Sequence, residues 1–384
     1  MRSKFLAAVA AAVALAALVE PSASAARSAG AGGENPAACL GGTVLSAVSA
    51  HRLPAGSIAY TYELPNGRSF KSIAPPAGFN PATASDALLA ELNLPQRPVG
   101  AAARTAWDVQ AAPFAKSRIS GAGTFCENKS LAEPPEAVAA GPKPAAAGRT
   151  AAGVAPAATS EGHYGFLDFS GYELQSGPYE KVVGHFTQPT SDFDSTISNW
   201  IGLNGTTEGG NDRLIQAGMD NSGEPFWELY CSGGSSDGCN AAMSGDIDAA
   251  PGDDISVSVS FNPATLMSYY AVAVNGAQVV NIEYQMIADS HSGDVADFLT
   301  ERPAPNLPGV PLYQNVVFSG SRTYTVWNSD TSVPFGSSNY FADEMEDTAN
   351  GTFYSPPCSN SVHLLMYPSN ITSGGFTNNV CSTD

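Results

Sequence analysis

Three polar side chains stand inside strand-like apolar segments of this 384-residue sequence. Gln216 lies in the segment LIQAG, Glu228 lies in FWELY, and Glu301 ends the segment DFLTE. A carboxylate can accept or donate a proton as a general base or acid, and a glutamine amide can donate hydrogen bonds to a developing oxyanion. The ordinary alternative is that each residue lies on the solvent-facing side of a strand, where alternating polar residues are common. The residue types alone leave both interpretations open.

Other motifs point less specifically to chemistry. Residues 234–238, GSSDG, fit the G-x-S-x-G pattern of hydrolases, but that pattern requires a preceding strand and a following helix. Here it lies between Cys231 and Cys239, so we expect a disulfide-closed loop. Two acidic pairs fit solvated turns better than calcium sites: Asp246 with Asp248, and Asp253 with Asp254. The histidines show no metal-ligand spacing: His51, His163, His185, His291 and His363.

The elements that must position the polar side chains have the pattern of strands. Residues 255–261, ISVSVSF, alternate apolar and small polar side chains, which is typical of a strand with one buried face. Asn275 and Gly276 separate two further strand-like segments, and this dipeptide is the strongest short signal for a β-hairpin. Turn residues recur between the candidate strands, and no long amphipathic helix is visible. We therefore predict an all-β fold, an antiparallel β-sandwich over residues 161–384.

The first residues carry an export signal. Arg2 and Lys4 precede an apolar run over residues 6–19, and the small residues ASA follow before residue 26. This order is typical of a secretory signal peptide, which we place at residues 1–25. The apolar run is too short to span a bilayer and no later stretch is long enough, so we expect a secreted, extracellular protein that is soluble.

Export also decides how the six cysteines are interpreted, because secreted chains form disulfides. Six cysteines allow fifteen pairings. A metal site is the alternative, but no CxxC spacing supports it. We expect neighbouring cysteines to pair: Cys39 with Cys126, Cys231 with Cys239, and Cys358 with Cys381.

Between the export signal and the sandwich, the sequence predicts a propiece and a linker. Residues 26–133 have modest structural signals, among them a short helix over residues 86–92 that Ser85 can cap. Residues 134–160 are rich in Ala, Pro and Gly and indicate a flexible linker. We expect a maturation cut between about residues 145 and 162, because exposed linkers are natural sites of proteolysis. A permanent two-domain protein is the alternative.

Charge separates the two halves of the chain. Residues 1–160 hold 13 basic and 9 acidic side chains, a net charge of +4, whereas residues 161–384 hold 4 basic and 27 acidic side chains, a net charge of −23. Binding to nucleic acid requires clustered Lys and Arg, so we expect no nucleic-acid partner. Nothing in the sequence indicates a membrane partner, an oligomer, a metal site or a cofactor, and we expect a monomer.

Five short motifs follow one another in the acidic half: WIGLNG at 200–205, LIQAGMD at 214–220, FWELY at 226–230, GDDI at 252–255 and ADFLTERP at 296–303. In this order and spacing they resemble the glutamic peptidase family, the eqolisins. Residues 164–189 are similar to the opening strands of that domain, so the resemblance extends over about residues 164–384. It implies a concanavalin-like jelly roll of two antiparallel sheets.

The resemblance also implies an acid endopeptidase that acts on proteins or peptides through a Gln/Glu dyad. The catalytic glutamine of the family falls on Gln216 and its catalytic glutamate on Glu301. The tryptophan that borders the substrate cleft falls on Trp200, and supporting acidic positions of the cleft fall on Asp220 and Glu228.

The sequence departs from the family pattern at four positions. Asn204 stands where fungal members carry Asp, Phe169 and Phe226 stand where Trp is usual, and Cys231 replaces a frequent Pro. These changes concern the wall of the cleft more than the dyad, so they put the substrate preference in doubt.

A glutamate and a glutamine are sufficient for amide hydrolysis. Glu301 can take a proton from water and hand it to the leaving nitrogen, while Gln216 donates N–H groups to the oxyanion. In an alternative cycle Glu301 starts protonated and donates to the carbonyl. Both cycles favour acid, because a carboxyl group works best near its own pKa of about 4.3. Acid also relieves the self-repulsion of the domain, so we predict greater stability at about pH 4 than at pH 7.5.

The opposite charges of the two halves suggest that the propiece inhibits the enzyme and dissociates on acidification, whereas assistance in folding is the alternative role. Two other classes of function also remain. One is a carbohydrate-binding or glycan-hydrolysing sandwich with Glu228 and Glu301 as paired carboxylates. The other is an inactive peptidase-like binding module, suggested by Asn204 and Cys231.

Overall fold

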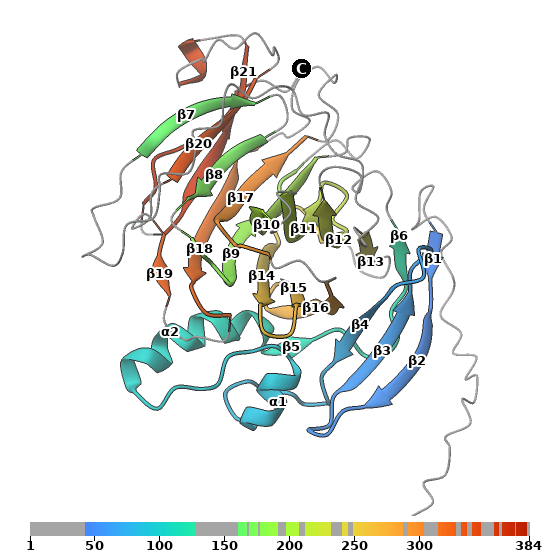
Figure 1. The fold of residues 1–384 in the computed structure, drawn as a ribbon. Helices are drawn as coiled ribbons and strands as arrows, with labels where there is room; N and C mark the ends of the chain where they lie inside the picture. The colour runs from blue at the N-terminus through green and yellow to red at the C-terminus, as the bar shows by residue number, and fades with distance from the viewer. Residues whose placement is uncertain are drawn as a thin grey trace, which may run out of the picture. The chain divides into compact units, whose positions relative to one another are not determined.

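Most of the described chain is β-strand, as the alternating sequence predicts (Figure 1). In this computed structural model the predicted leader, nearly all of the linker and residues 234–238 lie outside the described residues. Within the described ranges, no helix has the length and apolar character needed to cross a membrane. The described ranges are 43–127, 160–166, 169–175, 177–190, 197–206, 212–231, 240–244, 249–286, 291–302, 314–327, 332–335, 340–346, 357–360, 363–372 and 374–381.

One sheet, called the first sheet below, contains the segments that carry the polar candidates. Its neighbouring strands are antiparallel except for β20 and β7, which are parallel. Their order across the sheet is β13 (Asn240–Ser244), β12 (Pro225–Cys231), β11 (Asp212–Asp220), β10 (Ser198–Thr206), β17 (Val295–Glu301), β8 (Phe169–Leu174), β20 (Tyr340–Glu346) and β7 (Ser160–Phe166).

The second sheet is antiparallel throughout this set of strands, and β21 also pairs with β20 of the first sheet. A short strand, β19 (Val333–Pro334), pairs with β18, and a 3-10 turn, η4 (Cys358–Asn360), precedes β21. The order is β16 (Ala277–Gln285), β15 (Met267–Val274), β14 (Asp254–Asn262), β9 (Lys181–Thr187), β18 (Val316–Tyr324), β22 (Phe376–Val380) and β21 (Leu364–Pro368).

Alternate residues of the two sheets meet in one apolar core. Ile255, Val257 and Val259 of β14 belong to the same buried cluster as Ile215 and Ala217 of β11. Burying each aliphatic or aromatic side chain contributes roughly 1.5–3 kcal/mol, so this shared core is what stabilises the pair of sheets. The prediction of an all-β, sandwich-like fold is therefore confirmed, with the parallel β7–β20 pair as an exception to the antiparallel pattern.

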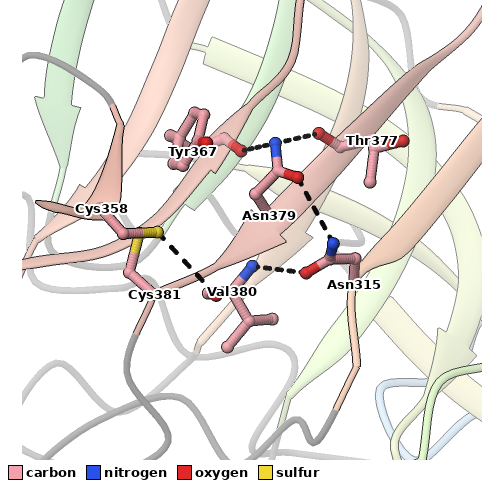
Figure 2. Close-up of a disulfide and its surroundings, with 7 residues drawn as sticks. All are labelled: Asn315, Cys358, Tyr367, Thr377, Asn379, Val380 and Cys381. Carbon is pink, nitrogen blue, oxygen red and sulfur yellow. Dashed lines mark hydrogen bonds between the residues drawn. A yellow bond between two sulfur atoms is a disulfide. The ribbon is translucent and has the colours of Figure 1, made fainter.

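Two local predictions in this part of the chain are confirmed. Asn275 and Gly276 join β15 to β16 with φ angles of 50° and 69°, the positive values that a two-residue hairpin turn requires. Cys358 and Cys381 form a disulfide beside the end of β22, where the N–H of Val380 donates to the side-chain oxygen of Asn315 at 2.9 Å (Figure 2). For the other expected pairs, Cys126 is disulfide-bonded and Cys39 and Cys239 lie outside the described residues.

Residues 43–127 form the front piece of the described chain, and residues 37–384 make up one compact unit. The predicted helix is confirmed as α1, with the Ser85 hydroxyl accepting the Leu88 N–H at 3.2 Å. The other elements were not predicted, although the alanine-rich start of α2 is a helix signal. The elements are β1 (Thr43–Leu45), β2 (Ala47–Arg52), β3 (Ile58–Glu63), β4 (Ser69–Ala74), α1 (Asp86–Glu91), α2 (Ala101–Ala111), η2 (Ala112–Phe114), β5 (Lys116–Ser117) and β6 (Phe125–Glu127).

The front piece corrects one expectation about β14. The alternation predicted one buried and one solvent-facing side, yet Ser256 and Ser260 of the polar side are buried as well. Phe114 of the front piece lines one small cavity with Ser260 and another with Ser256. The alternation identified the strand correctly, but it could not show that another part of the chain covers the polar side.

Candidate active site

A second, smaller apolar cluster lies on the face of the first sheet that points away from the main core. It is made of Trp200, Phe226 and Leu299, with Phe169 and Leu214 packed against them. Their direct neighbours along the same strands point into the main core, because successive strand residues alternate between faces. This outer face is where the polar candidates lie.

The strand register brings the predicted site residues to that one face. Gln216 lies directly opposite Glu228 on β12 and opposite Gly202 on β10. Glu301 of β17 lies opposite Ser198 of β10, two residues from Trp200. Residues that pair directly share a face, so Gln216, Glu228, Trp200 and Glu301 all project from the outer face.

Gln216 and Glu228 are joined by a hydrogen bond within the sheet surface. The Gln216 Nε2 donates to Glu228 Oε2 at 2.5 Å, and both side chains are buried, with exposed fractions of 4% and 2%. Burial raises the pKa of Glu228 well above its usual range, the hydrogen bond from Gln216 opposes that rise, and the charge of Glu301 adds to it. Glu228 therefore keeps its proton at higher pH than an ordinary glutamate does.

Trp200 holds the Glu301 end of the site. Its indole N–H donates to Glu301 Oε2 at 2.7 Å, which fixes one oxygen of that carboxylate. Trp200 lies directly opposite Gly218 of β11, where an added Cβ would lie too close to the Asn199 carbonyl oxygen and 2.7 Å from the Cβ of Trp200. A side chain at residue 218 would therefore displace Trp200 and with it the partner of Glu301.

A buried polar network lies beneath Trp200 and Glu301, and sequence reasoning missed it. Thr300 Oγ1 donates to Asn199 Oδ1 at 2.7 Å, and Asn378 Nδ2 of β22 donates to Thr300 Oγ1 at 3.0 Å and to the Ser170 carbonyl at 2.9 Å. Each of these residues is fully buried. The network ties strand β22 of the second sheet to the strands that carry Trp200 and Glu301. Asn378 lies far from the motifs in sequence, so no local pattern marks it.

Asp220 shares the outer face, but its carboxylate is engaged elsewhere. It accepts the Ser222 hydroxyl at 2.6 and 2.8 Å and the Glu224 N–H at 2.8 Å, so it closes the turn between β11 and β12. Burial raises the pKa of Asp220, and these hydrogen bonds oppose the rise. The described hydrogen bonds of this carboxylate thus serve the turn and do not reach Gln216 or Glu301.

The wall of the site also includes a buried aspartate and two phenylalanines. Asp297 is buried and lies opposite Gly202, which in turn lies opposite Gln216. Asp297 and Glu301 are four residues apart on β17 and therefore share a face, so the sequence could have indicated that Asp297 lies near the site. Phe169 and Phe226, which depart from the family pattern, belong to the outer apolar cluster, and the Phe169 ring lies 6.3 Å from the Trp200 ring at an angle of 89°. These departures therefore change the apolar wall around Trp200.

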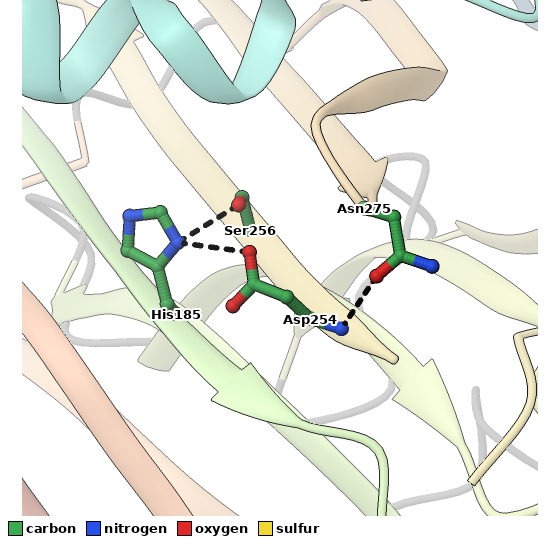
Figure 3. A network of polar contacts seen from close by, with 4 residues as sticks. All are labelled: His185, Asp254, Ser256 and Asn275. Atoms are coloured by element: carbon green, nitrogen blue, oxygen red, sulfur yellow. Dashed lines mark hydrogen bonds and ion pairs between the residues drawn. The ribbon is translucent and has the colours of Figure 1, made fainter. Parts of the chain in front are cut away.

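The histidines do not supply a rival site within the described residues. His291 is buried; its Nε2 faces the carbonyls of Leu203 and Arg213 at 2.9 and 3.1 Å, and burial lowers its pKa to about 4. His185 contacts Ser256 and Asp254 on the second sheet (Figure 3). Among the residues with a described position, no group of three His, Cys, Asp or Glu side chains is arranged to hold a metal ion.

The arrangement has two fixed polar groups with complementary chemistry. Glu301 offers a carboxylate that one N–H donor holds in place, and Gln216 offers an amide that Glu228 holds in place. Fixed groups of these kinds can exchange a proton and donate hydrogen bonds to a substrate oxygen without reorganising.

The match to known proteins falls on this part of the chain. Residues 168–355, which include all five predicted site residues, match the Peptidase A4 family. Among solved structures, scytalido-glutamic peptidase with a transition-state analogue inhibitor is 14% identical, with 56% of this chain and 98% of that chain covered and a TM-score of 0.40. SCP-B, a member of the eqolisin family in complex with the tripeptide Ala-Ile-His, is 13% identical, with 56% and 98% covered and a TM-score of 0.35. No curated protein sequence matches the chain. The match of residues 168–355 to the Peptidase A4 family thereby confirms the resemblance to the eqolisins.

Proposed function

We propose that this protein is a secreted acid endopeptidase that hydrolyses peptide bonds with water as the nucleophile and with Gln216 and Glu301 as its catalytic pair. The observation that carries the proposal is the placement of a fixed amide and a fixed carboxylate on one sheet face inside the segment that matches the Peptidase A4 family.

In the proposed cycle Glu301 takes a proton from a water molecule as that water attacks the carbonyl carbon. The same proton then passes to the leaving nitrogen, while the amide N–H groups of Gln216 stabilise the oxyanion. In the alternative starting state Glu301 is protonated and donates to the carbonyl oxygen. The acid and alkaline limbs of the pH–rate profile distinguish the two starting states.

The raised pKa of Glu228 supports work at acid pH. A neutral Glu228 can face the Gln216 amide without placing a second negative charge beside Glu301. As the pH rises and Glu228 ionises, its charge would bind the Gln216 N–H more strongly and draw it away from the substrate oxygen. We therefore expect activity to fall towards neutral pH.

The test is hydrolysis of an unfolded protein across pH 2–8 in the presence of an active-site inhibitor of aspartic proteases. The secreted protein is compared with the Glu301→Gln and Gln216→Ala variants, and β-glucan serves as a second substrate. We expect acid protein hydrolysis that resists the inhibitor and is lost in both variants. The proposal would be refuted if the chain cut within the linker hydrolysed no protein, or if it cleaved β-glucan instead.

Export is part of the same proposal and has its own test. The charged start, the apolar run and the small residues before position 26 support a cleaved leader over residues 1–25. We expect the protein recovered from the culture medium to begin at residue 26 or beyond. Retention inside the cell with residues 1–25 intact would contradict export.

We also propose that the front piece restrains the enzyme until the linker is cut. Its net charge is opposite to that of the peptidase domain, and the linker over residues 134–160 has the composition of a cleavable segment. Activity of the intact chain is compared with that of the chain cut within the linker, and separately made residues 26–150 are added to the mature enzyme. Equal activity before and after the cut, together with no inhibition by the added segment at any pH, would refute the restraint.

A further inference from the structure

The front piece pairs with the edge strand of each sheet on one side of the sandwich. Strand β6 pairs with β13, the last strand of the first sheet on that side, through Phe125, Cys126 and Glu127. Strand β4 pairs with β16, the last strand of the second sheet, through Phe70, Lys71 and Ser72. Strand β5 adds a parallel pair on β16. Without these strands, β13 and β16 would each present a row of unpaired backbone groups, which invites pairing with other chains.

Aromatic side chains of the front piece enter the core between the two edges. The Phe70 ring lies 5.0 Å from the Trp227 ring of β12, and it also contacts Tyr62 and Phe125 at 4.9 and 5.2 Å. These four side chains belong to the one buried cluster that holds both sheets together, and each is at most 3% exposed. The front piece is therefore part of the core of the sandwich.

The front piece also packs against the second sheet on the side that faces away from the core. Leu92, Leu94 and Phe114 line a small cavity with Ser258 and Ser260 of β14, and η2 lies against β15 and β16. The described contacts of the front piece therefore involve the edges and the second sheet, whereas Gln216 and Glu301 lie on the outer face of the first sheet.

Charged side chains contribute only a few of the described contacts between the front piece and the sandwich. Lys71 lies opposite Glu283 and attracts its carboxylate, and Asn93 also hydrogen-bonds to Glu283. The Arg68 guanidinium lies 5.0 Å from the centre of the Tyr284 ring, and Arg118 N–H donates to the Gln278 carbonyl at 2.9 Å. Apart from the interactions of Lys71 and Asn93 with Glu283, these bonds and the aromatic core do not depend on carboxylate charge.

From these contacts we propose that residues 43–127 stay bound to the sandwich as a non-covalent second chain after the linker is cut, where they keep the β13 and β16 edges paired. Acid would then leave the two pieces together, in contrast to the release expected from net charge. This inference does not rest on the catalytic roles of Gln216 and Glu301, because its test measures association and not hydrolysis.

The experiment uses the full chain with a site for a specific protease inserted between residues 134 and 159. After the cut, size-exclusion chromatography is run at pH 4 and at pH 7.5, each in low salt and in 1 M NaCl. The high salt shortens the Debye length to about 3 Å and so screens attraction between exposed charges. Because Cys126 of the front piece is disulfide-bonded, a non-reducing denaturing gel tests whether a disulfide joins the pieces, and a joined band would overturn the non-covalent association. We expect the two pieces to elute together in a 1:1 ratio under every condition. Separation at pH 4 or in high salt would overturn the proposal.

Three variants identify what holds the pieces together. Phe70→Asp places a charge in the aromatic cluster and should raise the dissociation constant at least ~10-fold. Val48→Asp is the matched control, because Val48 belongs to the same front piece and is 56% exposed, and it should leave association unchanged. Lys71→Glu removes the Lys71–Glu283 attraction without touching the core, so the pieces should still elute together. Release by Lys71→Glu alone would show that charge, and not the core, holds them.

Discussion

Two polar clusters of this protein differ in residue type, in burial and in geometry. The site cluster comprises Gln216, Glu228, Trp200 and Glu301. Gln216 and Glu228 are buried, Gln216 donates to Glu228, and the Trp200 N–H donates to Glu301. In the other cluster, His185 and Ser256 of the second sheet meet Asp254, whose side chain is 57% exposed (Figure 3). By residue type the second cluster has the three members of a Ser–His–Asp triad.

The geometry of the second cluster does not fit a catalytic triad. Ser256 Oγ lies 2.8 Å and Asp254 Oδ2 lies 3.7 Å from the same nitrogen, Nδ1 of His185. In a triad the serine and the carboxylate contact opposite nitrogens of the imidazole, so that one orients the ring while the other gives up its proton. Asp254 is further held by its own turn, where its N–H donates to Asn275 at 3.0 Å. Residue type therefore identifies candidates, and the atoms that meet decide between them.

The largest expected difference between the clusters is in rate. Gln216→Ala should reduce kcat by about 10²–10³, because the proposed oxyanion donor is lost. His185→Ala, the matched change in the second cluster, should leave kcat within about twofold, since surface changes away from the chemistry have small effects. Both are measured by hydrolysis of an unfolded protein at the acid optimum. Equal losses of kcat in the two variants would contradict the expectation that only the site cluster takes part in hydrolysis.

The pH profile gives the next largest effect. The raised pKa of Glu228 keeps it neutral in acid, and its ionisation as the pH rises should produce the alkaline limb of activity. Glu228→Gln removes that ionisation, so the variant should keep its activity at higher pH than the wild type. Asp254→Asn, the exposed carboxyl of the other cluster, is the control and should leave the profile in place. An unchanged alkaline limb in Glu228→Gln would assign that limb to another group.

A smaller effect is expected from the network beneath the site. Asn378→Ala removes the bonds to Thr300 and Ser170, and it should lower kcat roughly 10-fold through misplaced Trp200 and Glu301, with little change in KM. Asn281→Ala is the matched control. Asn281 lies on β16 of the second sheet, is similarly buried, and its side-chain N–H donates to the Ile73 carbonyl of β4 at 3.2 Å. Both should lose about 1–3 kcal/mol of stability. A loss of kcat in Asn281→Ala would reduce the Asn378 effect to stability alone.

The smallest effect concerns stability against pH. Burial raises the pKa values of Asp220, Glu228 and Glu283, so their contribution is complete below their unfolded values and declines as the pH rises. His291 acts in the opposite direction, because its pKa of about 4 lies below the ordinary 6.5 and its contribution is lost as the pH falls between these values. We expect a higher Tm near pH 4–5 than at pH 7.5. A Tm that rises steadily towards neutrality would contradict this balance.

The sequence was most informative where the relevant interaction is local. Alternation identified β14, the Asn275-Gly276 dipeptide identified a hairpin, and Ser85 identified the start of α1. Each depends on residues within a few positions of one another, so the pattern contains the whole cause. The family motifs named Gln216 and Glu301, and the strand register brings both to one sheet face, while their catalytic roles stay predictions.

Interactions between distant segments were beyond the reach of these patterns. The cover that the front piece provides over Ser260, and the bond from Asn378 to Thr300, join residues far apart in the chain. Asp220 shows a different limit, because a motif position fixes where a residue lies but not which atoms its carboxylate binds. The fold class could thus be predicted, whereas the supports of the site required the three-dimensional arrangement.

The crosslink between Cys358 and Cys381 has a consequence for how this protein is produced. The 23-residue separation places its expected contribution at roughly 3 kcal/mol, and it anchors the end of β22, the strand that carries Asn378. A host that folds the chain in a reducing cytosol would deliver protein whose β22 is less firmly anchored beneath Trp200 and Glu301. Preparations from reducing and oxidising hosts should then differ in specific activity as well as in yield, and a thiol titration would reveal the cause.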